Sequence, residues 1–251
     1  MTSPTLWMSL VITVSMILIV VVIGAGFYRS AHAPTISGQH YASTWFAGMF
    51  LAGWLLLALT LGAQDFFATV RNPAARVPTI AYALIPLVVG YALFSVVPAL
   101  RETVDGTPPQ WLIGMQVWRV LGAVFLIGYV QGQLPGVFAL PAGIGDVLIG
   151  LAAPAVAALV RARHPWSRPL AGLWNIVGLG DLVMAVTLGI LSSPGPFHLL
   201  ALDHPNRAIS AYPFVLIPTV GVPLSILLHL FSLRGLRNLT QHRRFQSSLT
   251  P

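Results

Sequence analysis

The sequence has 251 residues, of which 56% are hydrophobic and only 8% are charged. A soluble domain carries about 25% charged residues, so this composition excludes a chain that covers its surface with water-facing groups. There is no cysteine, which excludes disulfides, thiol catalysis and thiolate metal sites, and no lysine, which excludes a retinal-type Schiff base. The net charge of +7 comes from arginines at the ends of apolar segments, which indicates lipid headgroup contact rather than nucleic-acid binding.

Seven apolar segments have the length of a membrane span, which takes about 20 helical residues. Taken in chain order, they cover residues of about 6–27, 41–63, 79–100, 111–131, 137–160, 169–191 and 211–233. The sequence therefore predicts an all-α integral membrane protein: a bundle of seven transmembrane helices that forms one polytopic domain over residues 1–251. Nothing in the sequence indicates a linker, a low-complexity tract or a soluble domain.

The first segment allows a second interpretation, because Ala31-His32-Ala33 matches the small-x-small pattern of a signal-peptide cleavage site. However, no positive charge precedes the apolar run, and the run is longer than a signal peptide requires. We therefore expect an uncleaved helix with its N-terminus outside.

The distribution of arginine predicts the orientation of the bundle. If the N-terminus is outside, the three arginines of the outer loops are Arg71, Arg76 and Arg207. The inner loops and the tail then hold nine: Arg29, Arg101, Arg161, Arg163, Arg168, Arg234, Arg237, Arg243 and Arg244. The positive-inside rule favours this arrangement, with the C-terminus in the cytoplasm.

The third and seventh segments contain prolines that can kink or interrupt a helix. The third contains Pro86 and Pro98, and we expect residues 101–105 to form a short polar loop after it. The seventh contains Pro213, Pro218 and Pro223. Such a segment is either a kinked helix or a partly unwound one, as in transporters whose broken helices line a binding site.

Three segments carry charged side chains near their middle: Arg119, Asp146 and Asp181. One charge at a bilayer centre costs about 2.5–3.5 kcal/mol, so the three should face the interior and pair. At about 1.5 Å per residue they lie roughly 12–21 Å from the inner ends of their segments, within reach of one another. Small residues recur around Asp146 at helical spacing, which lets another helix approach closely. They are Ala139, Ala142, Gly143, Gly150 and Ala153.

Uncharged polar side chains extend this set. Gln116 lies on the same face as Arg119, and Asn175 precedes Asp181 in the sixth segment. In the seventh segment, Ser225, His229 and Ser232 form a stripe, in which His229 either relays protons or is a hydrogen-bonded structural residue. We therefore predict substrate binding or a proton relay at Arg119, Asp146, Asp181, Gln116, Asn175 and His229. The alternative is a buried ion pair that only holds the bundle together.

One arginine with two aspartates leaves an excess negative charge in a dry place. We therefore expect one aspartate to take up a proton near neutral pH, as carboxylates in proton-relaying transporters do. Arg119 would bind an anionic or hydrogen-bonding group of a solute. Trp118 and Trp174 lie deeper than the other tryptophans, and we expect them to line the cavity.

Residues 143–148 and 178–183 share the pattern Gly-x-Gly-Asp followed by two aliphatic residues. This pattern resembles that of the intramembrane aspartyl proteases, the presenilin and signal-peptide-peptidase group. The resemblance covers these short patches alone and implies that Asp146 and Asp181 share a proton and activate water. That family has Tyr-Asp at its first aspartate and Pro-Ala-Leu on a later span. Here glycine precedes Asp146, and Pro-Ala-Leu stands upstream at 98–100.

The leading functional prediction is a small-solute carrier or permease in the inner membrane, coupled to protons. The alternatives are a membrane-embedded enzyme that acts on a lipid, isoprenoid or peptide, and a non-catalytic subunit or sensor. We predict no cofactor and no metal, although His198, Asp203 and His204 in the outer loop suggest zinc as a further alternative. The predicted partners are membrane lipids and a small molecule, without nucleic acid; a homo-oligomer is compatible with the sequence.

Overall fold

A computed structural model of the chain describes residues 6–31, 41–68 and 84–249. Helices are the only regular secondary structure in these ranges. Six stretches are long and apolar enough to cross a membrane, and a seventh is counted if one sharply bent pair of helices is a single span. The predicted all-helical fold is confirmed, and the lengths and composition of these helices suit a multi-pass membrane protein.

Four of the predicted spans agree closely with single stretches of helix. These are α1 (Leu6–Ala31), α2 (Tyr41–Ala63), α7 (Gly136–Arg161) and α8 (Ser167–Ser192). The fourth predicted span is also continuous, but it consists of α5 (Pro109–Met115), the 3-10 helix η4 (Gln116–Gly122) and α6 (Ala123–Val130). A 3-10 stretch inside a span often marks a functional position. Here it carries Gln116 and Arg119.

The third predicted span is wrong as a straight helix. It is broken into α3 (Ile85–Val96) and α4 (Pro98–Asp105), which meet at 92°. Pro98 has no N–H to continue the helix, and it holds the preceding Val97 in an extended conformation with ψ 113°. Residues 101–105, predicted as a loop, belong to α4. Residues 79–83 lie outside the described part of the chain.

The seventh span begins later than predicted and is irregular. Residues 211–215 form a bend and turns instead of helix, with a cis peptide bond between Tyr212 and Pro213. The π-helix η6 (Ile217–Gly221) follows and continues into α9 (Val222–Leu249). The predicted break in this span is therefore present as a π-helix, while the predicted start at residue 211 is wrong.

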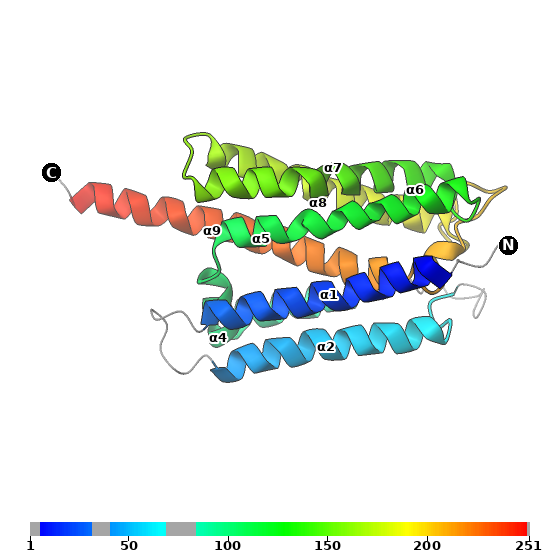
Figure 1. The fold of residues 1–251 in the computed structure, drawn as a ribbon, viewed down its shortest axis with the longest axis horizontal. Helices are drawn as coiled ribbons and strands as arrows, with labels where there is room; N and C mark the ends of the chain where they lie inside the picture. Colours follow the sequence, from blue (N-terminus) through cyan, green and yellow to red (C-terminus); the bar gives the residue numbers. More distant parts are fainter. Residues whose placement is uncertain (1–5, 32–40, 69–83, 250–251) are drawn as a thin grey trace.

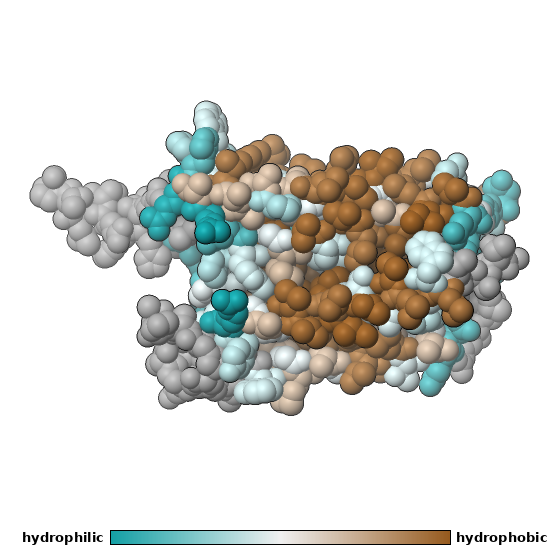
Figure 2. Space-filling model, viewed as in Figure 1, coloured by the Kyte–Doolittle hydropathy of each residue, from teal (hydrophilic) through white to brown (hydrophobic). Residues whose placement is uncertain are grey.

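The last span lies in the middle of the bundle. In the stretch from Ile217 to Asn238, 78% of the residues in an apolar 18-residue segment are buried, against 28–44% in the corresponding segments of the other spans. Figure 1 shows α9 between a pair formed by α1 and α2 and a group formed by α5 to α8. Figure 2 shows a broad apolar band across the middle of the molecule, with hydrophilic residues toward both ends, as expected for a surface that faces lipid.

The two ends of the bundle differ in charge. One end, here called the basic end, holds the C-terminal end of α1, α4, the α7–α8 connection and the described part of the tail, with Arg29, Arg101, Arg161, Arg163 and Arg168. The other end, here called the loop end, holds the connection from Ser193 to Arg207 between α8 and η5 (Ala208–Ser210).

The small residues of α7 are buried, as predicted, and they let η4 pack closely against this helix. A Cβ atom added at Gly150 would come within 2.6 Å of the backbone nitrogen of Val120, and one at Gly143 would come within 2.7 Å of Leu126. Glycine at these positions permits the close approach that brings Arg119 of η4 to Asp146 of α7.

Candidate functional site

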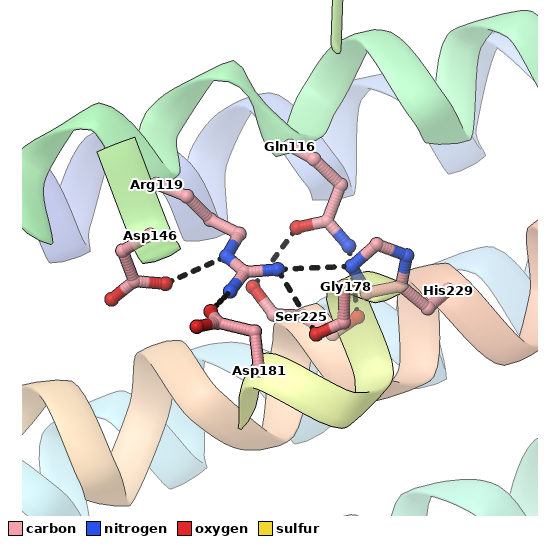
Figure 3. A network of polar contacts seen from close by, with 7 residues as sticks. All are labelled: Gln116, Arg119, Asp146, Gly178, Asp181, Ser225 and His229. Carbon is pink, nitrogen blue, oxygen red and sulfur yellow. Dashed lines mark hydrogen bonds and ion pairs between the residues drawn. The ribbon is translucent and has the colours of Figure 1, made fainter. Parts of the chain in front are cut away.

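Arg119 is the centre of a buried polar network at the interface of η4, α7, α8 and α9 (Figure 3). The residue is 1% exposed, and all three nitrogens of its guanidinium donate. Nε donates to Oδ1 of Asp146 at 2.7 Å, and Nη2 donates to Oδ2 of Asp181. Nη1 donates to the Gly178 carbonyl at 3.3 Å and to Nε2 of His229 at 3.1 Å.

The direction of these bonds fixes the form of His229. Arginine can only donate, so Nε2 of His229 accepts, and its ring is neutral with the proton on Nδ1. Nδ1 then donates to Oδ1 of Asn175 at 2.9 Å. The amide of Asn175 donates in turn to the Ala171 carbonyl at 2.7 Å and to Oγ of Ser232 at 3.1 Å. The result is a directed chain from Arg119 through His229 and Asn175 to Ser232.

Gln116 lies beside this chain and forms a separate pair with Ser225. Its amide donates to the Ser225 carbonyl at 2.9 Å, and the Ser225 hydroxyl donates to Oε1 of Gln116 at 3.0 Å. Of the six predicted site residues, the structure joins Arg119, Asp146, Asp181, Asn175 and His229 in one network. Gln116 instead joins η4 to α9.

One glycine of each Gly-x-Gly-Asp motif makes room for this network. A Cβ atom at Gly145 would collide with the carboxylate of Asp181, and one at Gly178 would come within 2.5 Å of the His229 ring. Gly122 of η4 lies in the same way against Asp146. The motifs therefore place two carboxylates and an imidazole around one guanidinium. Both aspartates bind that same guanidinium, an arrangement that differs from the paired carboxyls of an aspartyl protease, which share a proton.

The charges of the network do not cancel. With both carboxylates ionised, the guanidinium, the two aspartates and the neutral imidazole sum to −1 in a place with little access to water. A buried charge of this kind is costly unless it is compensated. One proton or one cation at the carboxylates restores neutrality.

A cavity lies between this network and the loop end of the bundle. It has a volume of about 50 Å³, and Asp146 is the charged residue in its wall. The remaining walls are apolar and come from α6, α7, α8, η6 and the neighbouring segments. They include Phe125, Phe138, Leu182, Ala185, Ile209 and Ile217.

The opposite side of the network is closed by an apolar cluster toward the basic end. Its buried residues come from α5, α7, α8 and α9 and include Ile113, Ala153, Val156, Ala171 and Leu236. Trp174 belongs to this cluster, and its ring lies 5.0 Å from that of His229. Trp118 packs against Gly221. Neither tryptophan lines the cavity at Asp146, so this prediction is wrong.

Residues 76–237, well over half of the chain, match the model of a family described as a domain of unknown function, DUF8737. The chain belongs to this family. The DUF8737 region contains every residue of the polar network and of the cavity wall. Helices α1 and α2 precede it. No curated protein and no solved structure matches the chain.

Several contacts of the site in the DUF8737 region could not be predicted from the sequence. The Gly178 carbonyl, which accepts from Arg119, carries no signal in the side-chain pattern. Ser232 and Ser225 stand in the stripe with His229, but the sequence does not reveal their partners. Within the described ranges, no three His, Asp or Glu side chains are arranged to hold a metal ion, so the loop residues His198, Asp203 and His204 give the zinc alternative no support.

Proposed function

We propose that the protein is a carrier for a small solute in the cytoplasmic (inner) membrane, with Arg119, Asp146 and Asp181 at its central site. The observation that supports this proposal is the cavity that reaches Asp146. A charge network whose purpose was only to hold helices together would need no cavity beside it. Here one of its carboxylates forms part of the wall of a cavity.

The position of Asp146 along its helix supports the same function. It lies ten residues from the first residue of α7 and fifteen from the last, or roughly 15 Å and 22 Å at the rise of an α-helix. Carriers bind their solutes near this depth, where access can pass from one side to the other. The cavity on the loop-end side and the apolar cluster on the basic-end side correspond to one open and one closed half.

We further propose that transport is coupled to protons and that the N-terminus lies outside. The excess negative charge of the network supports the coupling, because a proton and a solute can neutralise it in turn. The arginines at the basic end support the orientation.

Uptake by reconstituted vesicles tests the carrier. The purified chain is placed in proteoliposomes with a pH gradient, a mixture of small solutes is added, and the vesicle contents are identified by mass spectrometry. We expect at least one solute to accumulate with the wild-type protein and not with Asp146→Asn. Asp203→Asn is the matched control, because Asp203 is exposed in the connection at the loop end. No accumulation beyond protein-free vesicles would contradict the proposal, as would equal uptake by the Asp146 variant.

A further inference from the structure

We infer that the cavity binds a small apolar amine in its ammonium form, with the positive charge against the carboxylate of Asp146. This inference rests on the proposed function and names the chemical class of the solute. It follows from three properties of the site: the free oxygen of Asp146, the unavailability of Arg119, and the apolar and aromatic wall.

Asp146 offers one oxygen to a ligand. Its Oδ1 accepts from Nε of Arg119, whereas its Oδ2 accepts no hydrogen bond from the described residues. The side chain is 12% exposed, and the residue forms part of the cavity wall. An ammonium group donates to such an oxygen and neutralises its charge at the same time.

Arg119 is not available to an anion. Every nitrogen of its guanidinium already donates within the network, and the side chain is buried. The expectation that Arg119 binds an anionic group of the solute is therefore not supported by this geometry. The charged groups that face Asp146 are Arg119 from η4 and Asp181 from α8, while the neutral ring of His229 contacts Arg119 from α9. An anion in the cavity would make the net charge more negative, from −1 to −2, whereas a cation would bring it to zero.

The apolar walls favour a solute whose ammonium group is attached to an apolar group, here called its body. Strongly hydrated solutes such as sugars would lose water without gaining hydrogen bonds from aliphatic side chains. The rings of Phe125 and Phe138 both form part of the wall and lie 5.2 Å apart. These two rings add apolar surface that the body of the solute can contact. The volume of about 50 Å³ restricts the body to a small one.

Three probes with one apolar body and different heads test the inference. They are propylamine, a cation at neutral pH; propan-1-ol, which is neutral; and propanoate, an anion. Binding to the purified full chain in nanodiscs is measured by calorimetry. We expect the amine to bind at least about tenfold more tightly than the alcohol and the acid, because it alone pairs with the buried carboxylate. Equal binding of the alcohol, or tighter binding of the acid, would overturn the inference.

Two variants locate the binding site. Asp146→Asn should remove the preference for the amine over the alcohol. Ala185→Leu adds bulk to the cavity wall one helical turn from Asp181 without removing any group of the charge network, and it should weaken the binding of the amine by at least about tenfold. Ala155→Leu is its matched control on the exposed face of α7 and should bind like the wild type. If Ala185→Leu binds normally while eluting and unfolding like the wild type, the cavity is not the site and the inference fails.

These measurements separate the two proposals, because binding in nanodiscs involves no transport. Amine binding with the expected pattern but without uptake into proteoliposomes would support the solute class and contradict the carrier. Uptake of neutral or anionic solutes without amine binding would support the carrier and contradict the solute class.

Discussion

Gly145 and Gly180 occupy the same position in the two Gly-x-Gly-Asp motifs, but their surroundings differ. A Cβ atom at Gly145 would collide with the carboxylate of Asp181, whereas one at Gly180 would meet no atom within 4 Å. We therefore expect Gly145→Ala to lower the free energy of unfolding by about 1–3 kcal/mol, as overpacking does. Gly180→Ala should raise it by about 0.5–1 kcal/mol, because alanine loses less conformational freedom in a helix. Denaturant unfolding in detergent micelles measures both, and equal effects would contradict the packing described here.

Arg119 should be more costly to remove alone than together with its partners. Arg119→Met leaves Asp146 and Asp181 buried without their donor, and breaking a buried ion pair in this way costs about 3–5 kcal/mol. Adding Asp146→Asn and Asp181→Asn removes the unpaired charges and should restore most of this loss. The yield of monodisperse protein and the free energy of unfolding are the measurements. A triple variant that is no more stable than Arg119→Met would show that the charges are not what makes the single variant unstable.

The meeting of Arg119, Asp146 and Asp181 is predictable from sequence because each charge alone is too costly in a bilayer to face lipid. The details around them depend on the rotation and close approach of helices, which the sequence pattern does not specify. His229 illustrates this: its spacing indicates an inward face, but only the structure shows that it accepts from Arg119 and donates to Asn175. The Gly178 carbonyl is unpredictable for the same reason.

At the scale of whole elements, the π-helix η6 depends on a side chain from another span. Pro223 has no N–H, so it cannot donate to the carbonyl of Thr219 four residues earlier, as an α-helix requires. Nε1 of Trp54 in α2 donates to this carbonyl at 2.7 Å. A buried carbonyl without a donor costs about 1–3 kcal/mol, so this contact holds α2 to the seventh span.

Replacing Trp54 by phenylalanine removes the donor but keeps an aromatic ring. We expect Trp54→Phe to reduce the free energy of unfolding by about 1–3 kcal/mol. In a Pro223→Ala background the loss should be smaller, because the new backbone N–H can donate to Thr219 instead. Trp45→Phe, at a residue exposed on α2, is the control and should have little effect. An equal loss in both backgrounds would mean that packing of the indole, rather than its hydrogen bond, stabilises the element.

Proline residues occur both in a span that was predicted correctly, α7, and in the third span, which was wrongly predicted as one helix. Pro141 and Pro154 lie inside α7, which remains one helix of 26 residues, so proline alone does not break a span. Pro98 breaks the third span because the residues after it are amphipathic. In α4, Leu100, Thr103 and Val104 are buried, while Arg101, Glu102 and Asp105 are exposed. A short helix with this pattern is more stable at the membrane surface than across the bilayer.

The same helix is tied to the rest of the molecule at the basic end. Asp105 of α4 accepts from Nη2 of Arg234 at 2.6 Å and from Nδ2 of Asn238 at 3.2 Å, both in α9. Exposed ion pairs of this kind contribute roughly 0–1 kcal/mol, so their effect is on the position of α4 more than on stability. The charged residues of this helix thus lie with the other arginines of the basic end, and together they bear on how the whole molecule is oriented.

The orientation of the whole molecule can be measured directly, because the chain has no cysteine and single cysteines report without background. His164→Cys lies at the basic end and Asp203→Cys at the loop end, and both positions are exposed. With the N-terminus outside, a membrane-impermeant maleimide added to intact cells should label Asp203→Cys. His164→Cys should react only after the membrane is opened. The cysteine-free chain is the control for labelling of other proteins.

The result of that labelling also decides which compartment the cavity faces. The cavity wall runs from Asp146 toward the loop end, through Phe138, Gly189 and Ile209, while the apolar cluster closes the basic end. If the loop end is outside, the cavity lies in the exterior half of the bundle, and a cation would approach Asp146 from that side. The reverse labelling pattern would contradict the positive-inside assignment. It would place the same cavity on the cytoplasmic side, and the solute would then load from within the cell.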